Sequence, residues 1–329
     1  VLKMLAGNET ILDDCEDGNE FNNVGGIWFS FNDEPDQNSA CKKGSVSSIT
    51  PLSSKGHPFQ MTTSGYDGEG YAVHATYKLG SNYTPYNGGS CASWTNPAYV
   101  GIGTWVDDDE SNTMDWTGGT GVTFWYKGPA CTFQVIISEV KDYCFHKFDV
   151  PSCANWEKIT VKWNQLAQPT WGTAIDFSAK HVQKLQWQFE TGVTGNSGAT
   201  GDIWIDEVHI LGMPPIALTA LTISPVSDND LADDNLHANI DPLKIPIASG
   251  VAGDTLYLET TPTPSDASYP VTFWSSSDED VVTVDYKGRV IGVGYGEATI
   301  TARSKMHQDI SATYTVKVPA PKKNPESIS

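Results

Sequence analysis

The sequence predicts an all-β protein built from two β-sandwich domains. Its apolar residues recur in short alternating runs, and glycine, asparagine, aspartate, proline and serine interrupt these runs about every ten residues. No segment shows a convincing amphipathic helix longer than about two turns. A chain of 329 residues is also long enough for two domains that each bury a core of their own.

The alternation is clearest in three segments, which are residues 121–126, 132–137 and 158–163. In the last of them Ile159 and Val161 fall on one face, and lysine and threonine residues fall on the other. Because successive side chains of a strand point to opposite faces, this is the pattern of a half-buried strand. We expect one face of each segment to enter the core of a sandwich.

The first domain is expected to end near residue 213. Residues 203–210 have the pattern of a last strand, and Pro214 and Pro215 follow, which cannot continue a hydrogen-bonded ladder. Beyond them cysteine disappears and a single tryptophan remains. The predicted organisation is a first domain over 1–213, a second domain over 214–318, and a linker tail rich in proline and lysine over 319–329.

Charge excludes several classes of partner. The formal net charge is -20, from 40 acidic residues against 20 lysine and arginine residues. Such a field repels polyanions, so neither nucleic acid nor an anionic membrane surface is an expected partner. No apolar run approaches the roughly 18 residues that a membrane span needs. An acidic surface of this kind is also common on secreted proteins, and we expect the protein to be secreted or held at a bacterial cell surface.

Six cysteines, all within the first domain, favour disulfides over zinc. Their spacing contains no CxxC pair and no regular partnering with histidine. Disulfides in an oxidising compartment fit better, although 15 connectivities are possible and free buried thiols remain an alternative. Cys144 and Cys153 are the closest pair along the chain and flank a turn that contains proline, so they are one candidate bridge.

Aromatic residues are concentrated in the first domain. Ten of the eleven tryptophans fall within residues 1–213, together with twelve lysines and no arginine. Flat indole and phenol rings suit the C–H faces of pyranose rings, and amides and carboxylates suit their hydroxyl groups. Phosphate ligands would instead favour guanidinium groups. This composition favours a sugar-binding surface.

The second domain resembles the group 2 bacterial immunoglobulin-like domain over about residues 217–318. The motifs that carry the resemblance occur in the family's order and are Leu221-Thr-Ile-Ser-Pro225, the segment 271–278, the segments 281–285 and 288–290, and Gly296-Glu-Ala-Thr-Ile-Thr-Ala302. The acidic stretch from 226 to 248 departs from the family pattern as an insertion. The resemblance implies an immunoglobulin-like β-sandwich that acts as a spacer or an adhesive module.

The first domain resembles the jelly-roll modules related to carbohydrate-binding module family 11 over roughly residues 10–211. The motifs that carry the resemblance are the acidic segment 12–19, the segments 25–29 and 124–128, Trp171-Gly172, the segment 185–188, and the closing strand Trp204-Ile-Asp-Glu-Val208. Cys15 stands where an apolar residue is more usual. The resemblance implies a jelly-roll β-sandwich whose concave sheet binds β-glucans, usually attached to a plant cell-wall hydrolase.

Strand alternation selects the first candidate contacts with sugar. If Phe124, Phe133 and Val135 point into the core, their neighbours point outward, and the same rule applies to the segment 185–189. The side chains expected on the outside are those of Trp125, Gln134, Gln186 and Gln188. Amide groups supply donors and acceptors without charge, which suits a neutral polysaccharide. Ordinary solvated strand residues would give the same pattern.

Further candidates lie in or beside expected loops. Tyr143 and His146 follow a strand, where loop side chains can border a groove, and they would stack on and hydrogen-bond to a sugar. The aromatic cluster of Trp28, Phe29 and Phe31 also adjoins a loop, as does Trp171, so partial exposure of these rings is expected. Most of the ten tryptophans must nevertheless fill the core.

The acidic motif near the start also suggests a structural Ca²⁺ ion. Carboxylate and carbonyl oxygens at turn spacing are the ligands that Ca²⁺ selects. In a jelly roll the first and last strands are neighbours, so Asp14 and Glu16 could meet Asp206. The alternative is a turn in which aspartate side chains accept hydrogen bonds from local backbone N–H groups.

We therefore expect a monomeric, non-catalytic protein that binds a plant cell-wall polysaccharide. The expected ligand is a β-1,4 or mixed-linkage glucan, with cellulose and xyloglucan as possibilities. A structural or adhesive spacer segment of a bacterial surface protein is the alternative. A glycoside hydrolase fragment is a weaker prediction, because the consecutive acids at 107–110 have the sequence context of a solvated loop and no GxSxG, HExxH or phosphate-binding loop motif occurs.

Overall fold

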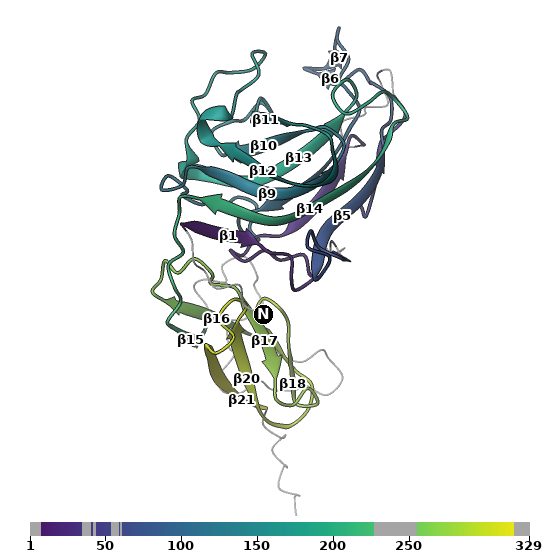
Figure 1. Cartoon of the computed structure of the whole chain (residues 1–329). Coiled ribbons are helices and arrows are strands. Elements are labelled where there is room, and N and C mark those ends of the chain that lie inside the picture. The colour runs from purple at the N-terminus through teal and green to yellow at the C-terminus, as the bar shows by residue number, and fades with distance from the viewer. Residues whose placement is uncertain are drawn as a thin grey trace, which may run out of the picture. The chain divides into compact units, whose positions relative to one another are not determined.

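The computed structural model describes residues 8–34, 41, 44–53, 59, 61–226 and 255–318. The predicted tail over 319–329 and most of the acidic insertion lie outside these residues. The chain divides into two compact units between residues 215 and 216, two residues beyond the boundary expected from the proline pair. Both units are β-sandwiches, so the predicted all-β fold class is confirmed (Figure 1).

The first unit is a jelly-roll sandwich of two antiparallel sheets (Figure 1). One sheet has seven strands in the order β12-β9-β14-β5-β3, with β1 paired to β14 and β4 paired to β5. Its strands are β1 (Glu9–Asp13), β3 (Ser48–Thr50), β4 (Thr62–Thr63), β5 (Tyr71–Lys78), β9 (Gly121–Gly128), β12 (Cys153–Lys162) and β14 (Thr200–Leu211). The pairing of Glu9 with Leu211 places the first and last strands of the unit side by side.

The other sheet has five strands in the order β11-β10-β13-β8-β2. Its strands are β2 (Trp28–Asn32), β8 (Tyr99–Trp105), β10 (Cys131–Ile137), β11 (His146–Val150) and β13 (Val182–Glu190). A small hairpin of β6 (Tyr86–Asn87) and β7 (Ser90–Cys91) and two 3₁₀ helices, η1 (Trp163–Gln165) and η2 (Ala179–His181), complete the described elements of this unit.

The core of the first unit lies between the two sheets. Phe124 from the seven-stranded sheet packs against Phe133 and Trp187 from the five-stranded sheet, with ring centroids 5.1 and 5.0 Å away. All three side chains are fully buried. The chain changes sheet between β9 and β10, and again between β11 and β12, so each sheet combines strands that are distant in sequence. The inner face of every long strand is therefore covered by the opposite sheet.

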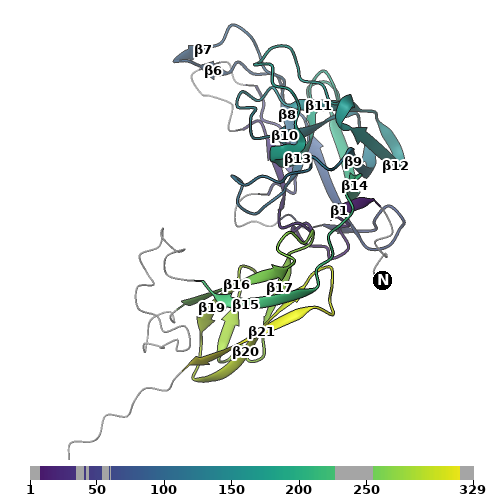
Figure 2. The same ribbon diagram turned by 90° about the vertical axis from the view of Figure 1, so that its left-hand side faces the viewer.

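The second unit is an immunoglobulin-like sandwich (Figure 2). Its four-stranded sheet has the order β15-β16-β19-β18, formed by β15 (Ala220–Pro225), β16 (Thr255–Thr263), β19 (Arg289–Gly292) and β18 (Val282–Val284). Its three-stranded sheet has the order β17-β20-β21, formed by β17 (Thr272–Ser276), β20 (Gly296–Ser304) and β21 (Ser311–Val318). Trp274 packs against the buried cluster that includes Leu258, Val290 and Ile300.

One disulfide, Cys41–Cys91, occurs among the described cysteines, with a Cα–Cα distance of 5.5 Å. The candidate bridge between Cys144 and Cys153 is wrong, because both are free and buried. Strand β11 runs between them, and five extended residues span about 16 Å, well beyond the roughly 7 Å that a disulfide permits between Cα atoms. Within the described part of the chain, no helix is long and apolar enough to cross a membrane.

Candidate functional site: the outer face of the five-stranded sheet

Four aromatic rings form a continuous line on the outer face of the five-stranded sheet. We call them the aromatic strip, which consists of Tyr99, Phe31, Phe29 and Trp105. Successive ring centroids lie 6.1, 6.0 and 5.4 Å apart. All four side chains are half-buried. The strip therefore offers a sequence of flat apolar surfaces, which suits stacking against a row of sugar rings.

Two glycines of β8 make room for the strip. The outward positions of β8 are Tyr99, Gly101, Gly103 and Trp105, and β2 pairs with this strand so that Phe31 lies opposite Gly101 and Phe29 opposite Gly103. A Cβ atom at Gly101 would lie 2.1 Å from Phe31 Cζ, and one at Gly103 would lie 2.5 Å from Phe29 Cζ. The phenylalanine rings of β2 thus lie across the backbone of β8 and fill the gap between its terminal aromatic residues.

A parallel line of polar side chains runs along β13, the next strand. This polar row consists of Lys184, Gln186, Gln188 and Glu190, which pair in register with the four outward positions of β8. Gln188 Nε2 donates a hydrogen bond to Glu190 Oε2 at 2.9 Å. The ends of the row carry opposite charges and its centre carries two amides. A ligand lying along the strip would meet hydrogen-bonding groups of no net charge beside it.

A third amide side chain, Gln134, lies beside the polar row on β10, the neighbouring strand of the sheet. Gln186 Nε2 donates to Gln134 Oε1 at 2.5 Å. Although both side chains project from the outer face, they are only 5% and 8% exposed, so they are recessed between taller neighbours. Beside them, Thr132 Oγ1 is buried and has no hydrogen-bond partner within the described residues. A buried hydroxyl without a partner is costly to the folded state.

Lys184 links the polar row to the aromatic strip. Its Nζ lies 4.3 Å from the ring centroid of Trp105 and 5.3 Å from that of Phe29. Burial of the side chain lowers the pKa of Lys184, and the charge of Glu110 acts in the opposite direction. The two distances place the ammonium group over the faces of these rings, where it can donate hydrogen bonds to a bound ligand.

The structure places the predicted glutamines on this face and the predicted Trp125 elsewhere. Gln134, Gln186 and Gln188 point outward as alternation requires, and their contact with sugar stays a prediction. Trp125 also points outward, but from β9 in the other sheet, where its ring stacks on Tyr66 at 4.4 Å. It cannot contribute to the same surface, because the core of the sandwich separates the two outer faces.

Two predicted contact residues lie in the interior. Trp28 is 2% exposed, donates from Nε1 to Asp13 Oδ2 at 2.6 Å, and stacks on Trp187, so the expectation of a partly exposed Trp28 is wrong. His146 is also buried, and its Nε2 donates to the carbonyl of Ile175 at 2.8 Å. Burial lowers the pKa of His146. The reason is the same for both residues: each occupies an inward position of its strand, so a role in a surface groove is ruled out.

Tyr143 and Trp171 are both strongly exposed, at 79% and 67%. The loops that carry them are tied together by Asp142, whose carboxylate accepts from the backbone N–H of Cys144 at 3.2 Å and of Thr173 at 2.7 Å. These hydrogen bonds lower the pKa of Asp142, with that from Thr173 the main cause. Both rings are therefore held on a braced double loop, and their contact with sugar stays a prediction.

The sequence pattern pointed to partial exposure of Phe29 and Phe31 but not to Tyr99 or Trp105. Phe29 and Phe31 alternate with the buried residues of β2, and Tyr99 and Trp105 stand at the two ends of β8. The available signal was the segment 99–105, in which Val100 and Ile102 alternate with glycine between two aromatic residues. Outward glycines flanked by aromatics indicate that another side chain lies over the strand.

The three expected calcium ligands are not assembled as a set. Within the described ranges, no group of three or more His, Cys, Asp or Glu side chains is arranged to hold a metal ion. Asp206 is buried, and its Oδ2 and Oδ1 accept hydrogen bonds from the backbone N–H groups of Tyr66 and Glu207 at 2.9 and 2.8 Å. Asp14 instead approaches Asn23 Nδ2 at 3.5 Å. Glu16 is one of the two acidic residues whose charges raise the pKa of Asp206.

The pKa of Asp206 is raised to about 7. Burial is the main cause, and the charges of Glu207 and Glu16 act in the same direction. The two backbone hydrogen bonds of Asp206 act in the opposite direction. The net result is a carboxyl group that is costly to ionise in the folded protein. Of the two hydrogen bonds that Asp206 accepts, that from Glu207 is local and that from Tyr66 is not, and the calcium site stays a prediction.

Comparison with known proteins gives a family for part of the second unit. Residues 243–316 match the family model of the Bacterial Ig-like domain (group 2). Over 73 residues the chain is 42% identical to Lacto-N-biosidase of Bifidobacterium bifidum. The alignment covers 21% of this chain and 6% of that protein.

A longer alignment leads to a different relative. Over 212 residues the chain is 29% identical to Endoglucanase 3 of Fibrobacter succinogenes. The alignment covers 64% of this chain and 28% of that protein. Among solved structures, the chain is similar to the Family 11 Carbohydrate-Binding Module from Clostridium thermocellum in complex with a β-1,3-1,4-mixed-linked tetrasaccharide. That similarity has 13% identity and a TM-score of 0.39, and covers 62% of this chain and 96% of the module.

Proposed function

We propose that this protein binds a β-glucan chain without cleaving it, on the outer face of the five-stranded sheet. The single observation that carries the proposal is the aromatic strip, in which four ring faces follow one another along β8. Linear polysaccharides repeat one flat ring after another, so a line of stacking surfaces suits a chain interior better than a single sugar.

The polar row supports a neutral ligand. Lys184 and Glu190 balance each other in charge, and Gln186 and Gln188 between them supply amide donors and acceptors. The first unit also contains no arginine, so no guanidinium fork is present for phosphate or sulfate groups. The relative named Endoglucanase 3 supports a glucan as the polysaccharide.

Tyr143 and Trp171 are the proposed outlying contacts. Their loops are braced by Asp142, so the two rings would contact a long or insoluble ligand with little loss of conformational freedom. The second unit is the proposed spacer, on the basis of its immunoglobulin-like fold. We propose further that the protein acts outside the cell as an accessory to glycoside hydrolysis.

Isothermal titration with cellohexaose, barley mixed-linkage glucan and xyloglucan tests the proposal. Truncation of Phe31 to alanine or of Trp105 to alanine should weaken binding by about 1 to 3 kcal/mol, because each removes a stacking face. Phe273→Ala, at an exposed phenylalanine of the second unit, is the matched control and should leave the affinity unchanged.

Three results would contradict the proposal. They are no binding of any of the three glucans by the wild-type chain, unchanged affinity in both strip variants, and new reducing ends after incubation with barley glucan. Melting temperatures of the variants separate loss of the site from loss of the fold.

A further inference from the structure

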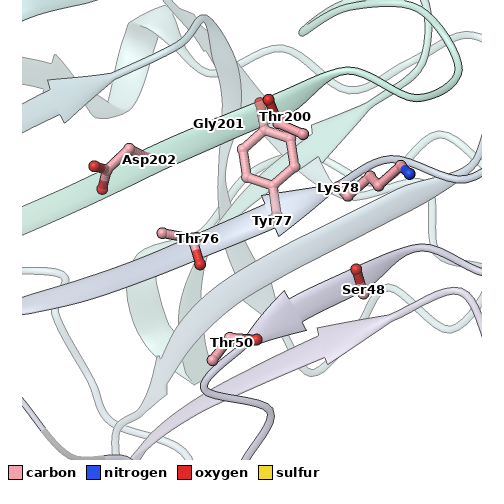
Figure 3. Close-up of a pocket in the computed structure, with 8 residues that line it drawn as sticks. All are labelled: Ser48, Thr50, Thr76, Tyr77, Lys78, Thr200, Gly201 and Asp202. Atoms are coloured by element: carbon pink, nitrogen blue, oxygen red, sulfur yellow. The ribbon is translucent and has the colours of Figure 1, made fainter.

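The opposite outer face of the first unit contains an open pocket of about 530 Å³ (Figure 3). It lies on the seven-stranded sheet over β3, β5 and β14. Eight residues line it, and Tyr77 and Gly201 are two of them. The other six project outward in two rows set by the strand register, which are Ser48, Lys78 and Thr200 in one row and Thr50, Thr76 and Asp202 in the other. The pocket is therefore formed by the sheet surface itself and not by loops.

The lining offers many hydrogen bonds and little net charge. Four of the six outward side chains carry a hydroxyl group, which can donate one hydrogen bond and accept others. Lys78 and Asp202 carry opposite charges. This combination resembles the polar row on the other sheet and suits a ligand rich in hydroxyl groups and without charge.

Asp202 is held in place by a neighbouring histidine. His74 Nε2 lies 2.6 Å from Asp202 Oδ1, while the Asp202 side chain is 62% exposed. The carboxylate is thus fixed at one oxygen and still accessible. A preoriented carboxylate at the edge of a pocket can accept hydrogen bonds from ligand hydroxyls at a low entropy cost.

An aromatic group borders the same edge of the pocket. His74 and Trp204 are paired across β5 and β14, two residues along from Thr76 and Asp202, and their rings stack with centroids 3.8 Å apart. Lys127 Nζ lies 4.4 Å from the Trp204 ring centroid, and Trp156 packs edge-on at 6.2 Å. Half-buried indoles beside a hydroxyl-lined floor give an amphipathic surface.

We infer that this pocket is a second glycan-binding site, which takes a short segment of a neutral polysaccharide. Its hydroxyl and carboxylate groups would bind ligand hydroxyls, and the His74–Trp204 pair would contact an apolar sugar edge. A volume of about 530 Å³ is within the range of small-molecule sites. With sites on both sheets, one sandwich would hold two chains, which goes beyond the single surface of the proposed function and raises retention on polysaccharide by multivalency.

The test is an NMR titration of the full chain with cellohexaose, xylohexaose and mannohexaose. It compares the wild type with the double variant Phe31→Ala/Trp105→Ala, which disables the aromatic strip. In the double variant at least one of these sugars should still shift the amide signals of Thr76 and Asp202. Adding Asp202→Ala or Thr76→Lys to the double variant should weaken that residual binding at least tenfold.

Thr160→Lys is the matched control for Thr76→Lys, because Thr160 is an exposed threonine of β12 outside the pocket. It should leave the residual binding unchanged. The inference is overturned if the double variant binds none of the three sugars, or if the pocket variants bind as well as the control. Binding by the wild type that disappears entirely in the double variant would remove this second site and leave the proposed function intact.

Discussion

The ring of Phe31 lies over the α-carbon of Gly101, so closely that a Cβ atom there would come within 2.1 Å of Phe31 Cζ. All three nearest atoms to that position belong to the Phe31 ring. At Gly103 the corresponding space is bounded by the Phe29 ring and also by the backbone carbonyl oxygen of Leu185, at 2.8 Å. The two glycines therefore differ in what a side chain would displace.

Gly101→Ala is expected to weaken glucan binding with little change in stability. The added methyl group displaces only the far end of a side chain, so the Phe31 ring leaves its place in the strip while the backbone stays in position. We expect an affinity loss of about 1 kcal/mol, measured by titration with barley glucan. Gly103→Ala is the comparison and should also lower the melting temperature, since it presses on the backbone of β13. Unchanged affinity in Gly101→Ala would contradict the proposed role of the strip.

Trp125→Ala is expected to lower stability and leave glucan binding on the five-stranded sheet intact. Trp125 projects from the other sheet and stacks on Tyr66 with an interplanar angle of 12°. Loss of that stack should cost about 1 to 2 kcal/mol, a decrease of roughly 2 to 8 °C in melting temperature for a domain of this size. A loss of affinity for the glucan, in a variant that is still folded, would show that the site extends to the seven-stranded sheet.

The raised pKa of Asp206 predicts that the stability of the protein depends on pH, which is best measured in the presence of a chelator. Burial raises its pKa from 3.8 to about 7, so the folded state binds the proton more tightly than the unfolded state. The free energy of unfolding should therefore rise as the pH falls from about 7 toward 4, by roughly 1.4 kcal/mol for each pKa unit realised. Denaturant unfolding at several pH values, compared with Asp206→Asn, isolates this group, because the variant should lose that part of the slope. Equal slopes in the two proteins would contradict the prediction.

A bound Ca²⁺ ion, which the acidic motif near the start of the chain predicts, can also be tested through Asp206. If Ca²⁺ binds beside Asp206, added calcium should raise the melting temperature of the wild type by mass action, and a chelator should reverse the shift. Asp206→Asn should abolish the response. Magnesium at the same concentration is the control, because it demands a stricter geometry. A melting temperature that is insensitive to calcium would remove the predicted ion.

Local patterns were sufficient for the faces of single strands. Phe133, Val135, Leu185 and Trp187 enter the core, and Gln134 and Gln186 project outward, because the two-residue period of a strand is a property of the backbone itself. Trp28 and His146 adjoin loops, yet they follow the same alternation. Both are inward residues of their strands.

Alternation also could not assign strands to sheets. Trp125 and Gln134 are both outward residues of consecutive strands, yet the chain crosses to the other sheet between them. Their side chains therefore face opposite sides of the sandwich. A second crossing, between β11 and β12, separates Cys144 from Cys153, whose short distance in sequence suggested a bridge.

The sequence by itself determined the fold class, the expected position of the domain boundary and the inward or outward direction of most strand residues, because these depend on residue spacing and on proline. Only the tertiary structure decided which outward residues share a surface. Phe31 and Gly101 are 70 positions apart in the numbering, and their contact exists because β2 pairs with β8 in one particular register. That register is set by packing over the whole core, so the aromatic strip emerges only when the sheets are assembled.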